Sequence, residues 1–260
     1  MNRIGQGLIL GVWIVGIGGG VGQAATGDDA GQRLAEVKQK ASQVESYRAD
    51  FTLTVTEADK PTTLSGTILY QQPDKRRIEF TNVPATEDVA QLVVSDGTTE
   101  WQYFPARKVA NQTSWAKLKA AGASPDALEV RGLHQPFVDV KPDTIRLVET
   151  KTEGNQPLYV FEAEPAPLLM AEAPFAPGKL RIAVAAADGL TRWLTMTDAS
   201  GREVLTQQYS KVQTKVSTNP EQFTFTPPPG VQVVDISEER ARAATAAPAE
   251  TPATPAGERP

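Results

Sequence analysis

The sequence predicts a mainly β protein of the α+β class, with a strongly curved, open antiparallel sheet covered by helices on one face. Most runs between residues 47 and 226 alternate apolar and polar side chains, as strands with one buried face do. Two of these runs contain an Asp-Gly pair, at 96–97 and 188–189, which is typical of tight hairpins. About ten such strands can curl and leave a space beneath a helical cover that suits an apolar ligand.

The composition excludes several classes of function. The 260-residue chain has no cysteine, one histidine and a formal net charge of −5. Thiol catalysis, thiolate metal sites, disulfides and a lipidated N-terminal cysteine are therefore excluded, and no positive field attracts nucleic acid. We find no phosphate-binding loop, nucleophile elbow or metal-ligand spacing, so we expect no cofactor, no metal and no enzymatic activity.

The N-terminus has the features of a secretory signal. Arg3 precedes an apolar run at residues 8–17, and small residues follow at 22–24. We expect residues 1–24 to be a cleaved signal peptide, with cleavage after Ala24 or Ala25; an uncleaved anchor is the alternative. The mature domain, residues 25–240, is then periplasmic.

The C-terminal residues 241–260 are rich in alanine, proline and threonine and lack large apolar side chains. Such a composition buries too little surface to offset the entropy of ordering, so we expect a disordered tail. A tether or a partner-binding segment is the alternative.

An N-terminal helix leads into the first strands. Residues 28–45 place Leu34, Val37, Ala41 and Val44 at helical spacing. Strands follow at 47–56, 64–71 and 77–80, where apolar residues alternate with polar ones.

The stretch 92–105 predicts the central hairpin. A two-residue turn at Asp96-Gly97 would pair Val94 with Thr99, Leu92 with Trp101 and Ala90 with Tyr103. These six side chains would share one apolar face. The opposite face would be mostly polar, with Glu100 and Gln102 on it.

Residues 111–133 interrupt the β pattern. Thr113 or Ser114 can cap a short helix that carries Trp115 and Leu118 and ends near Gly122. The stretch 124–126 is expected to start a second helical turn, which carries Leu128 and Val130.

The remaining strands are expected at 145–149, 158–164, 179–187, 190–198, 202–212 and 222–226. A two-residue turn at Asp188-Gly189 would pair Val184 with Trp193 and Ile182 with Thr195. Both faces of this hairpin are partly apolar, so we expect it to be covered on both sides or to line a cavity on one. The proline-rich stretch 165–178 carries large apolar residues and is expected to cover apolar surface.

Four segments, in order, resemble the LolA family of outer-membrane lipoprotein carrier proteins. The central signature is LVVSDGTTEWQYFP at 92–105, and QFTFTPPPGV at 222–231 resembles the family's C-terminal motif. GTILYQQPDKRR at 66–77 and YRADF at 47–51 match further segments. The resemblance implies an open antiparallel half-barrel with a helical lid that carries lipoprotein acyl chains across the periplasm. It further implies acylated lipoproteins, an inner-membrane release complex and an outer-membrane acceptor as partners.

The resemblance and the strand parity together define a candidate site. We expect the ligand-binding residues to be Phe51, Leu53, Ile68, Tyr70, Leu92, Val94, Trp101, Tyr103, Trp115, Leu118 and Trp193. Ordinary sheet packing is the alternative for Trp101, Tyr103 and Trp115. Gln72 stands where family members often carry a basic residue that latches the lid, so Arg76 or Arg77 is expected to act as latch or partner contact.

Three functions remain open at this point. The first is a monomeric periplasmic carrier for lipoprotein acyl chains. The second is a non-carrier regulator or envelope-stress sensor with the same fold, and the third is an enzyme that acts on envelope lipid. A carrier needs an apolar binding site, whereas a regulator needs only a surface.

Overall fold

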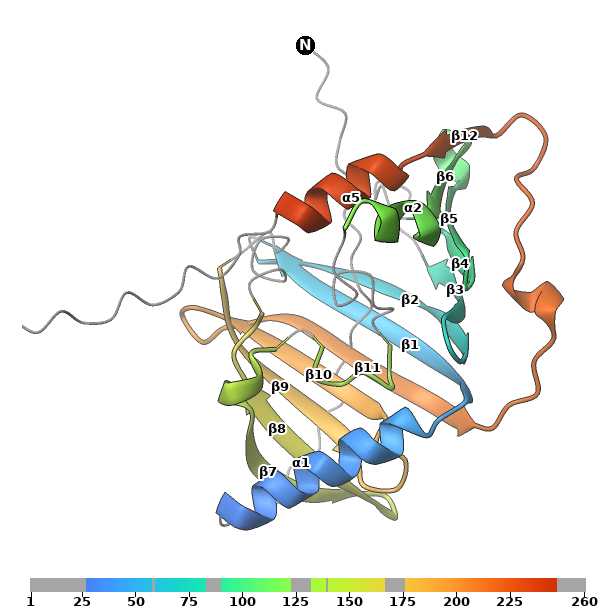
Figure 1. The fold of residues 1–260 in the computed structure, drawn as a ribbon. Coiled ribbons are helices and arrows are strands. Elements are labelled where there is room, and N and C mark those ends of the chain that lie inside the picture. Colours follow the sequence, from blue (N-terminus) through green and yellow to red (C-terminus); the bar gives the residue numbers. More distant parts are fainter. Residues whose placement is uncertain are drawn as a thin grey trace, which may run out of the picture.

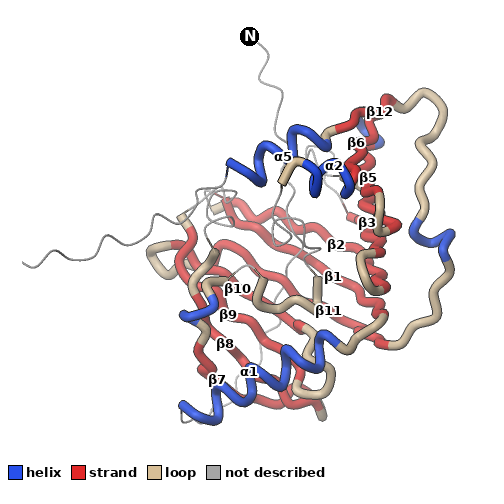
Figure 2. Tube along the Cα trace, in the orientation of Figure 1, coloured by secondary structure: helices blue, strands red, loops and turns tan. Residues whose placement is uncertain are grey.

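A computed structural model describes residues 27–57, 59–82, 90–122, 132–138, 140–166 and 176–246. Across these ranges, twelve strands form one sheet in the order β12-β6-β5-β4-β3-β2-β1-β11-β10-β9-β8-β7. The pairs are antiparallel, apart from the parallel pair β12 and β6. The sheet does not close, and it bends around the helices α1, α2 and α5 (Figures 1 and 2). The expected open, curved half-barrel is confirmed.

The strands and helices of the described ranges have these bounds. The strands are β1 Ser46–Glu57, β2 Lys60–Gln71, β3 Lys75–Asn82, β4 Leu92–Asp96, β5 Thr99–Phe104, β6 Val109–Ser114, β7 Arg146–Glu153, β8 Gln156–Ala163, β9 Pro177–Ala185, β10 Thr191–Asp198, β11 Glu203–Thr214 and β12 Gln232–Asp235. The α-helices are α1 Gly27–Ser42, α2 Trp115–Ala120 and α5 Ser237–Ala246, and the 3-10 helices are η1 Pro105–Arg107, η2 Pro142–Thr144 and η3 Pro220–Phe223.

The first helix and the early strands confirm the expected periodicities. Helix α1 packs Val37 into the core, Val44 follows it there just after the helix ends, and β1 continues with alternating buried side chains. Helix α2 begins at Trp115 because the Ser114 side chain accepts a hydrogen bond from the Lys117 amide. Of the described helices, none combines the length and the apolar character needed to span a bilayer.

Strand pairing determines which side chains share a face. Phe51 pairs with Gly66, Ile68 with Ile78, and Ile78 with Val93. Directly paired residues lie on the same side of a sheet, so one continuous face runs across these strands. We call it the inner face, because α1 packs on it through the core residues that surround Phe51 (Figure 1). The opposite side is the outer face.

The register predicted for the central hairpin is wrong by two residues. Leu92 pairs with Tyr103 and Val94 with Trp101, because the turn lies one residue later than expected. The Asp96 carboxylate accepts the amide hydrogens of Thr98 and Thr99, so Asp96 flanks the turn instead of lying within it. A shift of two preserves side-chain parity, so these four residues do share a face.

The register predicted for the second hairpin is also wrong. Trp193 pairs with Ala183 and Leu194 with Ile182, because the register shifts between Thr191 and Trp193. A one-residue shift exchanges faces, which puts Leu194 on the inner face and Trp193 on the outer face. The expectation that both faces are partly apolar is confirmed, since buried clusters lie on both sides.

The C-terminal segment differs most from expectation. Residues 220–223 form η3, closed by a capping box between Asn219 and Gln222, and not a strand. The chain then pairs β12 with β6 and continues into α5, which extends six residues past residue 240, the predicted end of the domain. Its alanines favour a helix although they lack apolar bulk. The signal segment, the turn at 124–126 and most of the stretch 165–178 lie outside the described residues.

Candidate ligand-binding face

The inner face is lined by one apolar cluster that spans most of the sheet. It includes buried side chains of β1, β2, β3, β8, β9, β10 and β11, together with α1 and the 132–138 stretch. Four predicted site residues belong to it: Phe51, Leu53, Ile68 and Tyr70, each 4% exposed or less. Strand alternation therefore placed these four correctly in the core, while their role in binding stays a prediction.

Helix α1 covers one end of the inner face through close backbone contact. The turn at Gly189 approaches the helix so closely that a Cβ there would lie 2.2 Å from the Val37 carbonyl oxygen. Gly189 also has φ of 72°, a conformation that glycine adopts at little cost. The Lys40 ammonium donates to the Ala186 carbonyl in the same turn. Helix α1 is thus fixed by backbone fit and by apolar side chains.

Part of the apolar face between the covers retains solvent contact. Ile78 on β3 and Val93 on β4 pair across the ladder, pack against the core cluster and are only partly buried. They are flanked by Ile68 on one side and by the polar residues of β5 on the other. An apolar ligand that contacted this strip would bury it further.

A buried aromatic group with the single histidine lies beside α1. The His134 ring stacks on Tyr70 with ring centroids 4.0 Å apart, and its Nδ1 lies 3.4 Å from the Tyr47 hydroxyl. Burial lowers the pKa of His134 to about 4 and raises the pKa of Tyr70 to about 12. Sequence reasoning missed this group, because no spacing in the sequence links His134 to the two tyrosines.

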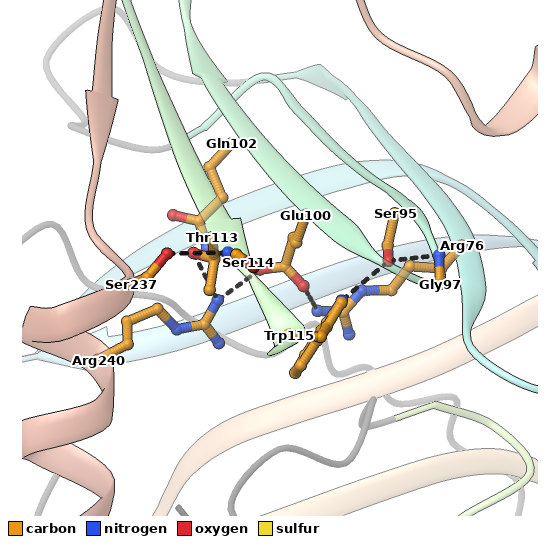
Figure 3. Close-up of polar contacts among 10 residues, drawn as sticks. All are labelled: Arg76, Ser95, Gly97, Glu100, Gln102, Thr113, Ser114, Trp115, Ser237 and Arg240. Carbon is orange, nitrogen blue, oxygen red and sulfur yellow. Dashed lines mark hydrogen bonds and ion pairs between the residues drawn. The ribbon is translucent and has the colours of Figure 1, made fainter. Parts of the chain in front are cut away.

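A polar cluster lies on the inner face beneath α2 and α5 (Figure 3). Glu100 on β5 is 1% exposed and contacts Arg76 through Oε2 and Arg240 through Oε1, the latter at 2.8 Å. Burial alone would raise the pKa of Glu100, but the two guanidinium groups outweigh it and lower the pKa to about 2. Glu100 is therefore ionised at every physiological pH.

Helices α2 and α5 are joined to this cluster by further hydrogen bonds. The Trp115 indole nitrogen donates to the Ser95 hydroxyl at 3.3 Å, and the Arg240 guanidinium lies over the Trp115 ring. The Ser114 amide donates to the Ser237 hydroxyl at 2.8 Å. Trp115 and Leu118 are buried, as predicted for the short helix, and Trp115 meets the polar Ser95 of β4.

Five predicted site residues lie on the outer face, and the expectation that they share the face of Phe51 is wrong. Leu92, Val94, Trp101 and Tyr103 pair with one another there, since Ser95 and Glu100 occupy the inner positions. Phe225 packs on Trp101 and Tyr103, with centroids 5.7 and 5.4 Å away. Trp193 joins the separate outer cluster with Leu158, Val160, Ala183 and Ala185. The face on which the β4 and β5 side chains lie could not be predicted, because it depends on the register of β4 against β3.

The two candidate latch residues point to opposite faces. Arg76 reaches Glu100 on the inner face, whereas Arg77 contacts Glu79 and the Gln222 carbonyl on the outer face. Gln72 donates through Nε2 to the Ser42 carbonyl, at the end of α1, at 3.0 Å. Arg77 and Gln72 therefore contact segments that cover the sheet, whereas Arg76 pairs with a residue of the sheet itself.

The polar residues of the Glu100 cluster are visible in the sequence, but their alternation along the hairpin suggested a face that is exposed to solvent. Ser95, Glu100 and Gln102 looked like the solvent-facing side of the hairpin, but all three are buried. Arg240, which completes the cluster, lies 140 residues away in a segment that was expected to end the domain. Within the described ranges, no group of three or more histidine, aspartate or glutamate side chains can hold a metal ion.

Comparisons with known proteins agree with this description. No protein-family model matches the chain. An outer-membrane lipoprotein carrier protein from Chromobacterium violaceum is 37% identical over 95 residues, which is 36% of this chain. The alignment spans 43% of that carrier protein, so the chain matches less than half of its length.

A solved structure shares the fold at low sequence identity. An uncharacterized conserved protein from Thermus thermophilus aligns with a TM-score of 0.52 and 12% identity, over 79% of this chain and 98% of that chain. A LolA superfamily protein from Nitrosomonas europaea aligns over 75% of this chain and 97% of that chain, with 11% identity and a TM-score of 0.35. The chain is thus similar to a lipoprotein carrier protein over 36% of its length and shares the fold of the Thermus thermophilus protein.

Proposed function

We propose that this protein is a periplasmic carrier that binds the acyl chains of lipoproteins on its inner face and takes them to the outer membrane. The observation that supports this most is the single apolar cluster across an open sheet, with Ile78 and Val93 left partly exposed between two helical covers. Burial of apolar surface stabilises by about 25 cal/mol per Å². A strip of this kind therefore favours an acyl chain over a polar ligand.

Other features of the chain support a carrier. The predicted signal peptide places the domain where acylated lipoproteins must cross water, and the relative in Chromobacterium violaceum is named a carrier of such proteins. The polar cluster around Glu100 is an ion-paired carboxylate with a low pKa, which is unsuited to general acid–base chemistry near neutral pH. Binding, and not catalysis, is the activity that these residues favour.

The partners follow from the same proposal. Acylated lipoproteins are the cargo, an inner-membrane release complex supplies them, and an outer-membrane acceptor receives them. The carrier acts as a monomer and needs no cofactor, because an apolar face with a releasable cover is sufficient to shield an acyl chain.

A pair of matched variants tests the binding face. Val93→Glu places a charge on the partly exposed inner strip, and Val148→Glu places the same charge on a valine of β7 that is 38% exposed. Desolvating the carboxylate on the inner face opposes binding, so we expect Val93→Glu to weaken binding of a fluorescent 16-carbon fatty acid by about tenfold or more. Val148→Glu should bind like the parent protein.

Native mass spectrometry of protein purified from the periplasm provides the complementary test. We expect a co-purifying lipid or acylated peptide. If the parent shows neither co-purified lipid nor saturable probe binding, the carrier proposal is wrong and a protein-binding regulator with the same fold replaces it.

A further inference from the structure

We propose that α5 is a displaceable plug, built into the chain, that occupies one end of the inner face and competes with cargo. This inference rests on the proposed function, because it assigns a regulatory element to the same binding face. Figure 1 shows that the chain runs along the outside of the sheet after β11, pairs as β12 with β6, and returns over the inner side as α5.

The attachment of α5 is mainly polar. Its sequence, SEERARAATA, contains no apolar residue larger than alanine, and Ala241 is the apolar side chain that it buries among its described ones. Helix α1, in contrast, inserts Val37 into the core and packs the partly buried Leu34 against it. Because the gain from burial scales with apolar area, α5 gains far less from the hydrophobic effect than α1 does.

Arg240 makes the ion pair between α5 and the sheet, beside the hydrogen bond that the Ser237 hydroxyl accepts from the Ser114 amide of β6. Its Nη1 donates to Glu100 Oε1 at 2.8 Å and to the Thr113 hydroxyl at 3.2 Å. The Arg240 side chain is 24% exposed, and that of Arg76 is 12% exposed. Arg240 thus reaches Glu100 from the solvent side, while Arg76 approaches it from within the sheet.

The sheet side of this contact remains satisfied when α5 leaves. Glu100 Oε2 keeps its ion pair with Arg76, and Oε1 keeps the hydrogen bond from Gln102 Nε2 at 3.2 Å. A buried carboxylate that lost all of its partners would be strongly unfavourable. Here, departure of Arg240 leaves one ion pair in place, so α5 can detach without stranding a buried charge.

Cargo and α5 compete because they cover one face. Arg240 contacts Glu100 and Thr113, which lie on the same side of the sheet as Val93, since Val93 pairs with Gln102 and Ser95 with Glu100. An acyl chain that extends along this side from Ile78 and Val93 meets α5 and Trp115. Any free energy needed to detach α5 is subtracted from the affinity for cargo.

Two variants on the same helix test the plug. Arg240→Gln removes the contact with Glu100, and Arg242→Gln removes the same charge from an exposed residue whose Nε donates to the Glu238 carbonyl of α5 itself. We expect Arg240→Gln to bind the fluorescent fatty acid about tenfold more tightly than the parent, because a hydrogen bond to a charged group is lost from the closed state alone. Arg242→Gln should match the parent.

A second variant covers the case in which Arg240→Gln fails to fold. The chain contains no cysteine, so Ser114→Cys combined with Ser237→Cys can form one cross-link between the end of β6 and the start of α5, where the Ser114 nitrogen and the Ser237 hydroxyl lie 2.8 Å apart. The oxidised protein, with α5 fixed in place, should lose probe binding, and reduction of the same sample should restore it.

The outcomes separate the inference from the proposed function. Saturable binding by the parent, with equal affinity in Arg240→Gln and in the oxidised pair, overturns the plug and leaves the carrier intact. Absence of binding in the parent and in Arg240→Gln overturns the carrier and the plug with it. Saturable binding by the parent and tighter binding by Arg240→Gln support both.

Discussion

The two helical covers of the inner face are held by different interactions. Helix α1 packs Val37 into the core and meets the Gly189 turn at backbone distance. Helices α2 and α5 are held by the Glu100 cluster and by two further hydrogen bonds, one from the Trp115 indole to Ser95 and one from the Ser114 amide to the Ser237 hydroxyl. Apolar close packing has no substitute partner in water, whereas polar groups can exchange their contacts for hydrogen bonds with water. We therefore expect α1 to be the fixed cover and α5 the releasable one.

The largest expected effect comes from the carboxylate at the centre of the polar cover. Glu100→Gln leaves Arg76 and Arg240 without their anion, and we expect a loss of about 4 kcal/mol in the free energy of unfolding. Glu79→Gln is the control, because Glu79 pairs with Arg77 on the adjoining outer face but is 47% exposed, and it should cost under about 1 kcal/mol. Urea denaturation measures both. Equal losses would show that burial of the ion pair contributes nothing.

The next largest effect tests whether close packing against Gly189 holds α1 in place. Gly189→Ala adds a Cβ 2.2 Å from the Val37 carbonyl and 2.5 Å from the Ala41 amide, and it should destabilise by about 3 kcal/mol. Gly154→Ala has a similar backbone, with φ of 60°, but no atom within 4 Å of the new Cβ. It should lower the free energy of unfolding by only about 1 kcal/mol, because the left-handed backbone conformation is then the one source of strain. If both variants melt together, close approach to α1 is not what fixes the helix.

A smaller effect depends on pH and concerns the histidine beside α1. The pKa of His134 is lowered to about 4 in the folded chain, whereas its ordinary value is 6.5. Between these two pH values the unfolded chain therefore binds a proton more readily than the folded chain does. Stability therefore rises with pH through this window and is lost as the pH falls, by about 2 kcal/mol between pH ~7 and pH ~5. His134→Phe keeps a ring against Tyr70 and should remove that share of the pH dependence. Equal pH slopes for the variant and the parent would contradict this explanation.

The smallest expected effect concerns a single hydrogen bond of the polar cover. Trp115→Phe retains a ring at the start of α2 and removes the indole hydrogen bond to Ser95, whose hydroxyl keeps its contact with the Gly97 amide. We expect a loss of about 1 kcal/mol, measured by urea denaturation. A loss as large as that of Glu100→Gln would mean that Trp115, and not the ion pair, holds the cover.

The strands were predictable from sequence because alternation and turn residues are local signals. Helix α1, the short helix at Trp115 and the strand through Phe51 all appear close to their predicted bounds. The face on which Trp101 lies was not predictable, since an internally consistent hairpin fits either side of a sheet until its neighbour fixes the parity. Bulges such as the one before Trp193 leave no clear local signature.

The candidate site was only partly predictable for a related reason. Its apolar members follow strand parity, but its polar members depend on contacts between distant segments. Arg240 reaches Glu100 from a helix at the predicted end of the domain, and His134 reaches Tyr47 and Tyr70 from a loop. Buried polar groups of this kind are specified by their tertiary partners, and those partners have no fixed spacing in the sequence.

Hydrogen–deuterium exchange with and without a saturating acyl probe tests the difference between the two covers most directly. We predict that amides of α5, residues 237–246, exchange faster when the probe is bound, while amides of α1, residues 27–42, stay equally protected or become more so. The opposite result, with α1 exchanging faster and α5 unchanged, would contradict the assignment of α1 as the fixed cover and α5 as the releasable one.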